Sequence, residues 1–291
     1  MIRPGFVLGI ARAEARLTRR LVRFWVFAVL SVILGMLAYL NFYFIHRFAS
    51  SMSASAAAIN PRYFVGSFGS NFLFLFVIGL VFLAYDVRAR DKRERMSEVL
   101  DTLPCSNLEL VLGKALGVFL PAWAIALFSA GLVQGIGLLA GAPVEPRSLV
   151  TFVFFMAIPT YVFTIGLVYF LTLLLRHRLL ASVVVLAVIV TAFFATLWWV
   201  PFFSAPAMDV TGGYTMQFPS DIVGRVITGE NLVHRLAFLL AGIGLLWLSA
   251  AIHPRQDDGS KTVRAATGAA VLILGAGLIT LQIVQTQNML E

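Results

Sequence analysis

Residues 86–109 read DVRARDKRERMSEVLDTLPCSNLE, the one densely charged stretch in an otherwise mostly apolar chain of 291 residues. Across the chain, 60% of the residues are hydrophobic, only 12% are charged, and the mean hydropathy is +0.91. Soluble domains carry about 25% charged residues, so this chain has too little polar surface to cover a soluble globule. Its apolar runs are continuous and about 20 residues or longer, which suits spanning helices rather than barrel strands. The composition therefore predicts an all-α polytopic membrane protein.

Seven charge-free runs surround the charged stretch, and each is long enough to cross about 30 Å of hydrocarbon. The expected spans are 24–45, 66–85, 115–140, 149–175, 179–201, 236–252 and 265–285. No Asp, Glu, Lys or Arg falls in the middle of any of these runs. Because such a residue normally marks an ion or proton path, the pattern disfavours an ion-coupled carrier.

The basic residues predict the orientation of the spans, because lysine and arginine accumulate on the cytoplasmic side. With the N-terminus inside, most of the 22 Lys and Arg residues fall on inner segments. The outer segments hold Arg47, Arg62, Arg147, Arg225 and Arg235. The net charge of +8 is then a topology signal rather than a nucleic-acid-binding surface, and the C-terminus is expected outside.

Within the charged stretch, residues 92–103 are predicted to form a short amphipathic helix on the inner membrane surface. Its apolar face carries Met96, Val99, Leu100 and Leu103, and its acidic face carries Glu94, Glu98 and Asp101. Asp91 and Glu94 can cap its start, and Pro104 ends it because proline lacks the backbone donor. Ser106 and Glu109 then form an S-x-x-E capping box that opens the next helix. A plain connecting loop would explain the arginines but not the two stripes, so a partner-docking helix is preferred.

Residues 4–22 predict a second amphipathic helix, which would lie in the membrane interface. Apolar residues recur at helical spacing at Phe6, Ile10, Ala13, Leu17 and Leu21. Basic residues follow another face at Arg12, Arg16, Arg19 and Arg23. These arginines would contact anionic lipid headgroups. The alternative is a positively charged tail that only sets topology.

The sequence carries no pattern for nucleotide hydrolysis or metal chemistry. Gly113-Lys114 lacks the upstream glycine and the following Ser or Thr of a phosphate-binding loop. The single cysteine, Cys105, excludes a disulfide pair within the chain. The four histidines are scattered without the paired spacing of metal ligands. We therefore expect a chain that is not an enzyme and binds no cofactor or metal of its own.

The stretch RDKRERMSEVLDTLPCSNLELVLGK resembles the cytoplasmic segment of ABC-2 type transporter permeases. In that family an acidic-hydrophobic run precedes Leu-Pro-x-Ser and an apolar stretch that ends in Gly-Lys. The matching residues here are Glu98-Val99-Leu100, Leu103-Pro104-Cys105-Ser106 and Leu110 to Lys114. The resemblance covers about residues 1–252, including the basic helix before the first span and an outer element between the fifth and sixth spans.

The resemblance implies an exporter permease in the bacterial-type inner membrane, working as a homodimer or with a second permease. It implies that residues 92–103 are a coupling helix seated in a groove on a separate cytoplasmic ATPase, which would bind ATP and magnesium. The docking residues would be Glu94, Met96, Glu98, Val99, Leu100, Asp101, Leu103 and Pro104. The alternative is a membrane scaffold or accessory subunit that moves no substrate.

Two further predictions concern an outer loop and the C-terminal residues. In the outer loop 202–235, Pro219, Asp221, Ile222 and Val226 could form a short helix that dips into the outer leaflet as an outer gate. An ordinary surface loop explains these residues equally well.

The family core has six spans, whereas residues 253–291 predict a seventh helix and an outer tail, so we treat 1–252 as the permease domain and 253–291 as an addition.

Overall fold

A computed structural model describes most of the chain. The described ranges are 3–52, 61–86, 105–141, 144–175, 177–198, 204–213, 227–255 and 259–288. Within these ranges the chain is helical and forms no strand. The predicted coupling helix 92–103 and the outer-gate residues Pro219, Asp221, Ile222 and Val226 lie outside the described residues.

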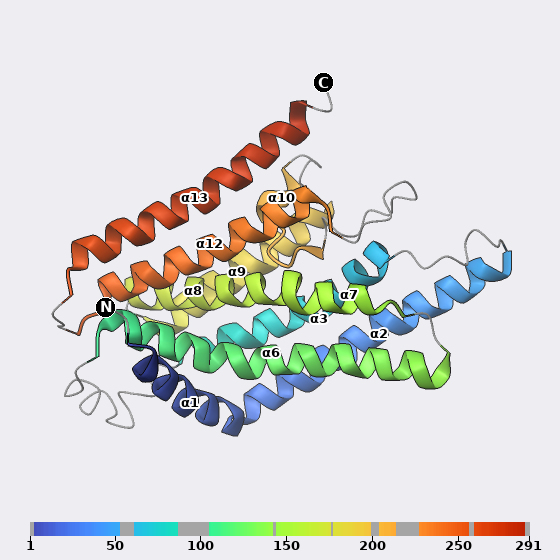
Figure 1. The fold of residues 1–291 in the computed structure, drawn as a ribbon, viewed down its shortest axis with the longest axis horizontal. Helices are drawn as coiled ribbons and strands as arrows, with labels where there is room; N and C mark the ends of the chain where they lie inside the picture. The colour runs from blue at the N-terminus through green and yellow to red at the C-terminus, as the bar shows by residue number, and fades with distance from the viewer. Residues whose placement is uncertain are drawn as a thin grey trace.

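The described helices form an elongated bundle (Figure 1). In chain order they are α1 (Pro4–Arg20), α2 (Val22–Met52), α3 (Pro61–Ala84), α6 (Asn107–Ala140), α7 (Pro146–Thr151), η2 (Phe152–Ala157), α8 (Ile158–Leu174), α9 (Arg178–Trp198), α10 (Ala205–Met208), α12 (Gly229–Ile252) and α13 (Lys261–Asn288). In the described ranges, 7 helical segments are long and apolar enough to cross a membrane. The predicted all-α polytopic architecture with seven spans is therefore confirmed.

Several helices extend further than the charge-free runs from which they were predicted. The first spanning helix, α2, continues to Met52, and α6 begins at Asn107 rather than near residue 115. Helical hydrogen bonding continues past the first charged residue because that residue can lie in the headgroup region. The sixth spanning helix starts at Gly229, so the prediction that Arg235 lies in an outer loop is wrong.

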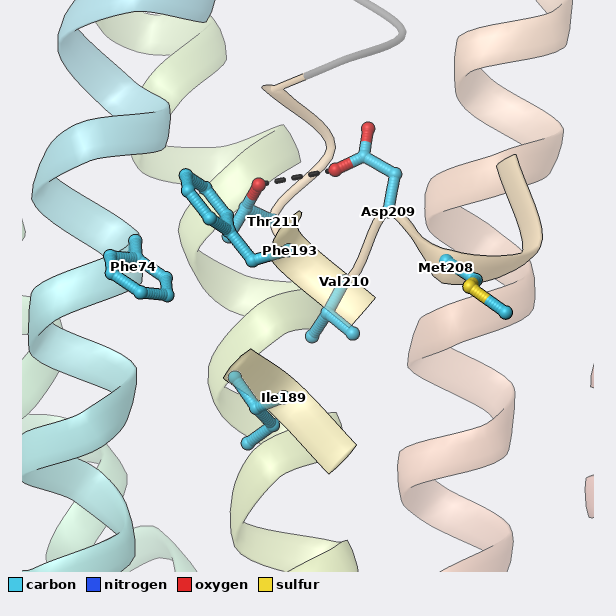
Figure 2. A pocket seen from close by; sticks show the side chains of 7 residues that line it. All are labelled: Phe74, Ile189, Phe193, Met208, Asp209, Val210 and Thr211. Carbon is cyan, nitrogen blue, oxygen red and sulfur yellow. Dashed lines mark hydrogen bonds between the residues drawn. The ribbon is translucent and has the colours of Figure 1, made fainter. Parts of the chain in front are cut away.

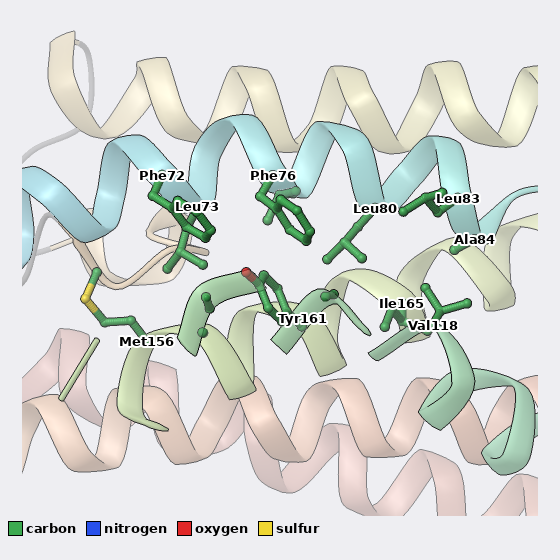
Figure 3. Close-up of a cluster of buried hydrophobic side chains, with 14 of the residues drawn as sticks. Phe72, Leu73, Phe76, Leu80, Leu83, Ala84, Val118, Met156, Tyr161 and Ile165 are labelled. Atoms are coloured by element: carbon green, nitrogen blue, oxygen red, sulfur yellow. The ribbon is translucent and has the colours of Figure 1, made fainter. Parts of the chain in front are cut away.

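The most buried spanning helix is α3, which packs against α2, α6, α8 and α9. Phe72 and Phe76 stack with ring centroids 5.7 Å apart, and Phe72 meets Phe152 edge to face at 5.4 Å. Figure 3 shows Leu80 and Tyr161 in the same cluster. Offset and edge-to-face aromatic pairs fix relative ring positions, so this cluster holds α3, η2 and α8 in register.

The N-terminal helix α1 packs along the first turns of α6. A Cβ atom on Gly113 would lie 2.7 Å from the Ile10 Cβ, and one on Gly117 would lie 2.3 Å from the Glu14 Cβ. These two small residues, four apart, allow the two helix backbones to approach closely. The buried face of α1 consists of Val7, Ala11, Glu14 and Thr18 rather than its most apolar stripe.

The seventh helix, α13, packs against α12 over much of its length (Figure 1). A Cβ atom on Gly268 would lie 2.9 Å from the Leu248 backbone N, and one on Gly275 would lie 2.8 Å from the Ala237 carbonyl O. Small residues at these crossings bring the backbones together. The two helices are therefore a closely packed hairpin, and α13 belongs to the bundle.

Candidate functional site

The residue before the predicted coupling segment is held by an ion pair. Asp86 is the last described residue before position 105, and its Oδ2 accepts a hydrogen bond of 2.9 Å from Arg23 Nη2. The Arg23 guanidinium also lies 5.9 Å from the centre of the Tyr85 ring. The Asp86 side chain is only 11% exposed, so solvent screens this pair less than a surface pair. The pair joins the end of α3 to the start of α2.

The described residues after segment 87–104 contact the loop between α12 and α13. Arg255 Nη1 donates to the Cys105 carbonyl O at 2.6 Å and lies 3.3 Å from the Cys105 Sγ. In return, Asn107 Nδ2 donates to the Arg255 carbonyl O at 2.8 Å. Cys105 and Asn107 are both buried. These reciprocal contacts fix the first turn of α6 to the end of α12.

Glu109 adds a second attachment at the start of α6. Its backbone N donates to Ser106 Oγ at 3.2 Å, and its Oε2 accepts from the Ser106 backbone N at 2.8 Å, so the predicted capping box is confirmed. Its Oε1 also accepts a hydrogen bond of 2.6 Å from the Arg3 backbone N. The Arg3 guanidinium lies 3.4 Å from both carboxylate oxygens. A buried carboxylate is stabilised by several donors in this way, and the contacts tie α6 to the N-terminus.

The described residues on either side of segment 87–104 are therefore bonded to other parts of the bundle, and their partners differ. The first end is bonded to α2 through Arg23, and the second is bonded to the N-terminus through Arg3 and to the α12–α13 loop through Arg255. Figure 1 shows the N-terminus, the start of α6 and the end of α12 at the same end of the bundle.

The predicted lipid-binding arginines lie on two helices. Arg12, Arg16 and Arg19 are exposed on α1, where Arg16 Nε and Arg19 Nε each donate to a backbone carbonyl one turn earlier. Arg23 belongs to α2 instead and is bonded to Asp86. Contact of α1 with lipid stays a prediction.

A second polar cluster lies where α12 begins, around residues 204–213. Arg235, only 2% exposed, donates from Nη1 to the Val210 carbonyl O at 3.0 Å and from Nη2 to Thr160 Oγ1 at 2.7 Å. It also donates to the carbonyls of Phe155 and Met156, each at 3.0 Å. The planar guanidinium has donors in a fixed fork, so it can hold several acceptors at once.

The sequence of α8 explains why the Phe155 carbonyl is available. Pro159 has no backbone N–H, so the carbonyl of Phe155 lacks the partner that an α-helix would supply. The preceding turn is a π-helix, a form often found at functional positions. The Val153 carbonyl of the same turn accepts a hydrogen bond of 3.1 Å from Trp123 Nε1 of α6. Side chains from α6 and α12 thus satisfy this irregular turn.

Most of segment 204–213 is buried among the helices, while Ala207 and Met208 are exposed. The Asp209 carboxylate accepts from Thr211 Oγ1 at 3.1 Å and from the Gly212 backbone N at 2.9 Å, which closes a turn with a positive φ of 75° at Gly212. His234 Nε2 lies 2.8 Å from the Pro206 carbonyl O. A Cβ atom on Gly213 would lie 2.3 Å from the Ser70 Cβ of α3. This segment is thus wedged between α3, α8 and α12.

One pocket borders this segment on its α9 side. Its lining residues are Phe74, Ile189, Phe193, Met208, Asp209, Val210 and Thr211, and its empty space, part of it open to the surroundings, is about 210 Å³ (Figure 2). Phe74 of α3 and Phe193 of α9 stack with centroids 4.0 Å apart. The pocket is mostly apolar and narrow, so it provides local free space rather than a formed binding site for a large molecule.

Sequence reasoning missed Arg235 and the 204–213 segment. Arg235 was counted as an outer topology signal because it precedes a charge-free run. Two signals could have found it: Thr228 and Asn231 can cap a helix that begins before Arg235, and Pro159 in an apolar run leaves a carbonyl without its partner.

A comparison with curated proteins found no match for this chain. Residues 56–253 match the family described as ABC-2 family transporter protein. The match runs from before α3 to the end of α12 and includes the charged stretch, whereas its partners Arg3, Arg23 and Arg255 lie outside the matched residues. More than half of the chain is covered, and the resemblance of its charged stretch points to the same family. The chain is a multi-pass membrane protein that belongs to the ABC-2 family of transporter proteins.

Proposed function

We propose that this chain is the permease subunit of an ABC exporter in a bacterial-type inner membrane and moves its substrate outward. A separate cytoplasmic ATPase, which binds ATP and magnesium, docks on residues 92–103. The N-terminus and the charged stretch face the cytoplasm, and the C-terminus faces outside. Two permease chains, identical or paired, form the working unit. Residues 219–226 contribute the outer gate.

The observation that supports this proposal best is the attachment of segment 87–104 at both ends. Asp86 is bonded to Arg23, Cys105 to Arg255, and Glu109 to Arg3. A solvated connecting loop needs no such attachments, whereas a docking element must transmit force without moving independently of the spans. Because the chain has no phosphate-binding loop of its own, the energy must come from a partner.

The proposal is tested by the Leu100→Asp substitution, which places a charge in the apolar stripe of the docking helix. The purified detergent complex should lose the ATPase subunit, because a desolvated apolar contact tolerates an unpaired charge poorly. Retention is measured by affinity purification of the permease followed by quantification of the bound ATPase. Arg90→Gln, in the basic part of the same segment, is the matched control and should retain the ATPase.

Equal retention of the ATPase by the Leu100→Asp and Arg90→Gln variants would contradict docking at this helix. A non-transporting scaffold is separated by a second measurement on reconstituted vesicles. An exporter should show ATP hydrolysis that rises when its substrate is added, because transport and hydrolysis share one cycle. A scaffold should bind the ATPase with no such response.

A further inference from the structure

Arg255 lies beyond the six-span core, yet it contacts the first residues after the predicted coupling segment. The Cys105 carbonyl O accepts 2.6 Å from Arg255 Nη1, and the Arg255 carbonyl O accepts 2.8 Å from Asn107 Nδ2. Cys105 is 4% exposed and Asn107 is fully buried, while Arg255 is half-buried, so water has limited access to both bonds. The bond from the Arg255 guanidinium is charge-assisted and therefore stronger than a neutral one.

Arg255 is held on its own side by a closely packed hairpin. It follows the last turn of α12, and its backbone N lies 3.3 Å from His253 Nδ1. The α12 helix is backed by α13 through the close approaches at Gly244, Gly268 and Gly275. A pair of helices packed at such short backbone distances moves as a unit, because separating them would open a void.

The other end of α12 carries the Arg235 cluster. Arg235 donates to the Val210 carbonyl O, and His234 contacts the Pro206 carbonyl O, so α12 also holds segment 204–213. Between Arg235 and Ile252 the helix rises by about 26 Å, at about 1.5 Å per residue. The uninterrupted helix α12 therefore has the Arg235 hydrogen bonds near its start and the Arg255 hydrogen bonds just after its end.

We infer that Arg255 is a positioning residue that ties the α12–α13 hairpin to the exit of the coupling segment, so that displacement of that segment moves α12 and segment 204–213 with it. The inference rests on the proposed function, because it assigns the route by which ATPase movement reaches the far end of the bundle. It also gives the seventh helix a role, since α13 supports α12 and the loop that carries Arg255. Coupling of this kind requires one rigid element on which both sites act. Here that element is α12.

The test measures an ATP-dependent distance in the complex of the full-length permease with its ATPase. Spin labels are attached by ketone chemistry at Leu138, near the end of α6, and Leu232, near the start of α12, which leaves Cys105 unmodified. Both positions are exposed. Distances are compared by pulsed electron resonance without nucleotide and after trapping with magnesium, ATP and vanadate.

The unsubstituted complex should show a shift in the distance between the labels on trapping. Arg255→Ala should reduce this shift by about half or more, while ATPase retention and vanadate trapping persist, because docking is intact but the link to α12 is lost. Arg255→Lys should be intermediate, since lysine keeps the positive charge and a donor group but loses the planar fork. The matched control is Lys261→Ala, at an exposed residue near the same loop at the start of α13. Its distance between the labels should change on trapping as much as in the unsubstituted complex.

An unchanged shift in Arg255→Ala would overturn the inference, as would a trapped unsubstituted complex with no shift. If Arg255→Ala yields no folded complex, the shift of Arg255→Lys is compared with that of the unsubstituted complex. A reduced shift supports the inference, and an unchanged shift overturns it. A permease that retains no ATPase, or a complex that traps no nucleotide, would instead overturn the proposed function itself. The failure of the two proposals can thus be distinguished.

Discussion

Arg235 shows how a charged side chain is accommodated inside an apolar bundle. Its guanidinium is surrounded by three backbone carbonyls and the Thr160 hydroxyl, all within 3.0 Å. An isolated charge at this depth would be costly, but preorganised carbonyl dipoles replace its water. The arginine in turn supplies the Phe155 carbonyl with a donor in place of the backbone N–H that Pro159 lacks. Arg235 and the irregular η2 turn therefore stabilise one another.

Replacing Arg235 with leucine should destabilise the folded permease. The carbonyls of Phe155 and Met156 would lose the Arg235 hydrogen bonds, and each acceptor left without a partner costs about 1–3 kcal/mol. We expect the thermal unfolding midpoint in detergent to fall by about 5–15 °C. Arg47→Ala, at an exposed arginine of α2, should leave the midpoint nearly unchanged. An Arg235→Leu midpoint equal to that of the control would contradict the stabilising role.

At the scale of helices, close backbone approach contributes, beside apolar periodicity, to which faces are buried. Ile10 of the apolar stripe of α1 lies against Gly113 of α6, but the most buried residues of α1 include Glu14 and Thr18. Gly113 and Gly117 of α6 offer a groove into which this narrower face fits. Periodicity reports hydrophobic side chains, whereas helix association in membranes also follows small residues and backbone distance.

The α1–α6 contact predicts opposite results for two glycines of the same helix. A Cβ atom on Gly117 would lie 2.9 Å from the Ala11 carbonyl O, while one on Gly131 would meet no atom within 4 Å. Gly117→Ala should lower the unfolding free energy by about 1–3 kcal/mol through overpacking. Gly131→Ala should raise it by up to about 1 kcal/mol through helix propensity. Thermal unfolding of both purified variants provides the comparison, and equal effects would show that α1 does not depend on this approach.

The hairpin of α12 and α13 can be tested in the same way. Gly268 lies against the backbone of α12, whereas Gly277 of the same helix has no atom within 4 Å of a built Cβ. Gly268→Leu should loosen the hairpin, because the Leu248 and Gly244 backbones cannot move aside as a flexible side chain would. Protease cleavage in the α12–α13 loop should become faster in Gly268→Leu and stay unchanged in Gly277→Leu. Cleavage at the same rate in both variants would argue against a rigid hairpin.

At the scale of the whole molecule, the sequence predicted the number and type of spans because hydrocarbon thickness imposes long apolar helices. It predicted the capping box at Ser106 and Glu109 because that motif is local. It could not place Arg255 beside Cys105 or Arg235 beside Phe155, since these pairs are 150 and 80 positions apart and no periodicity links them. Helix ends were also misplaced, because charge marks the hydrocarbon boundary and not the end of helical hydrogen bonding.

The central claim is that a separate ATPase docks on residues 92–103 at the cytoplasmic side. It is tested most directly in intact membranes by a photo-reactive side chain at Ser97, within the predicted docking helix, with Met52 at the far end of α2 as the control position. After illumination, we expect an adduct between position 97 and a chain that carries a phosphate-binding loop, identified by mass spectrometry, and no such adduct from position 52. Absence of that adduct from position 97, or equal yields from both positions, would contradict docking of an ATPase on residues 92–103.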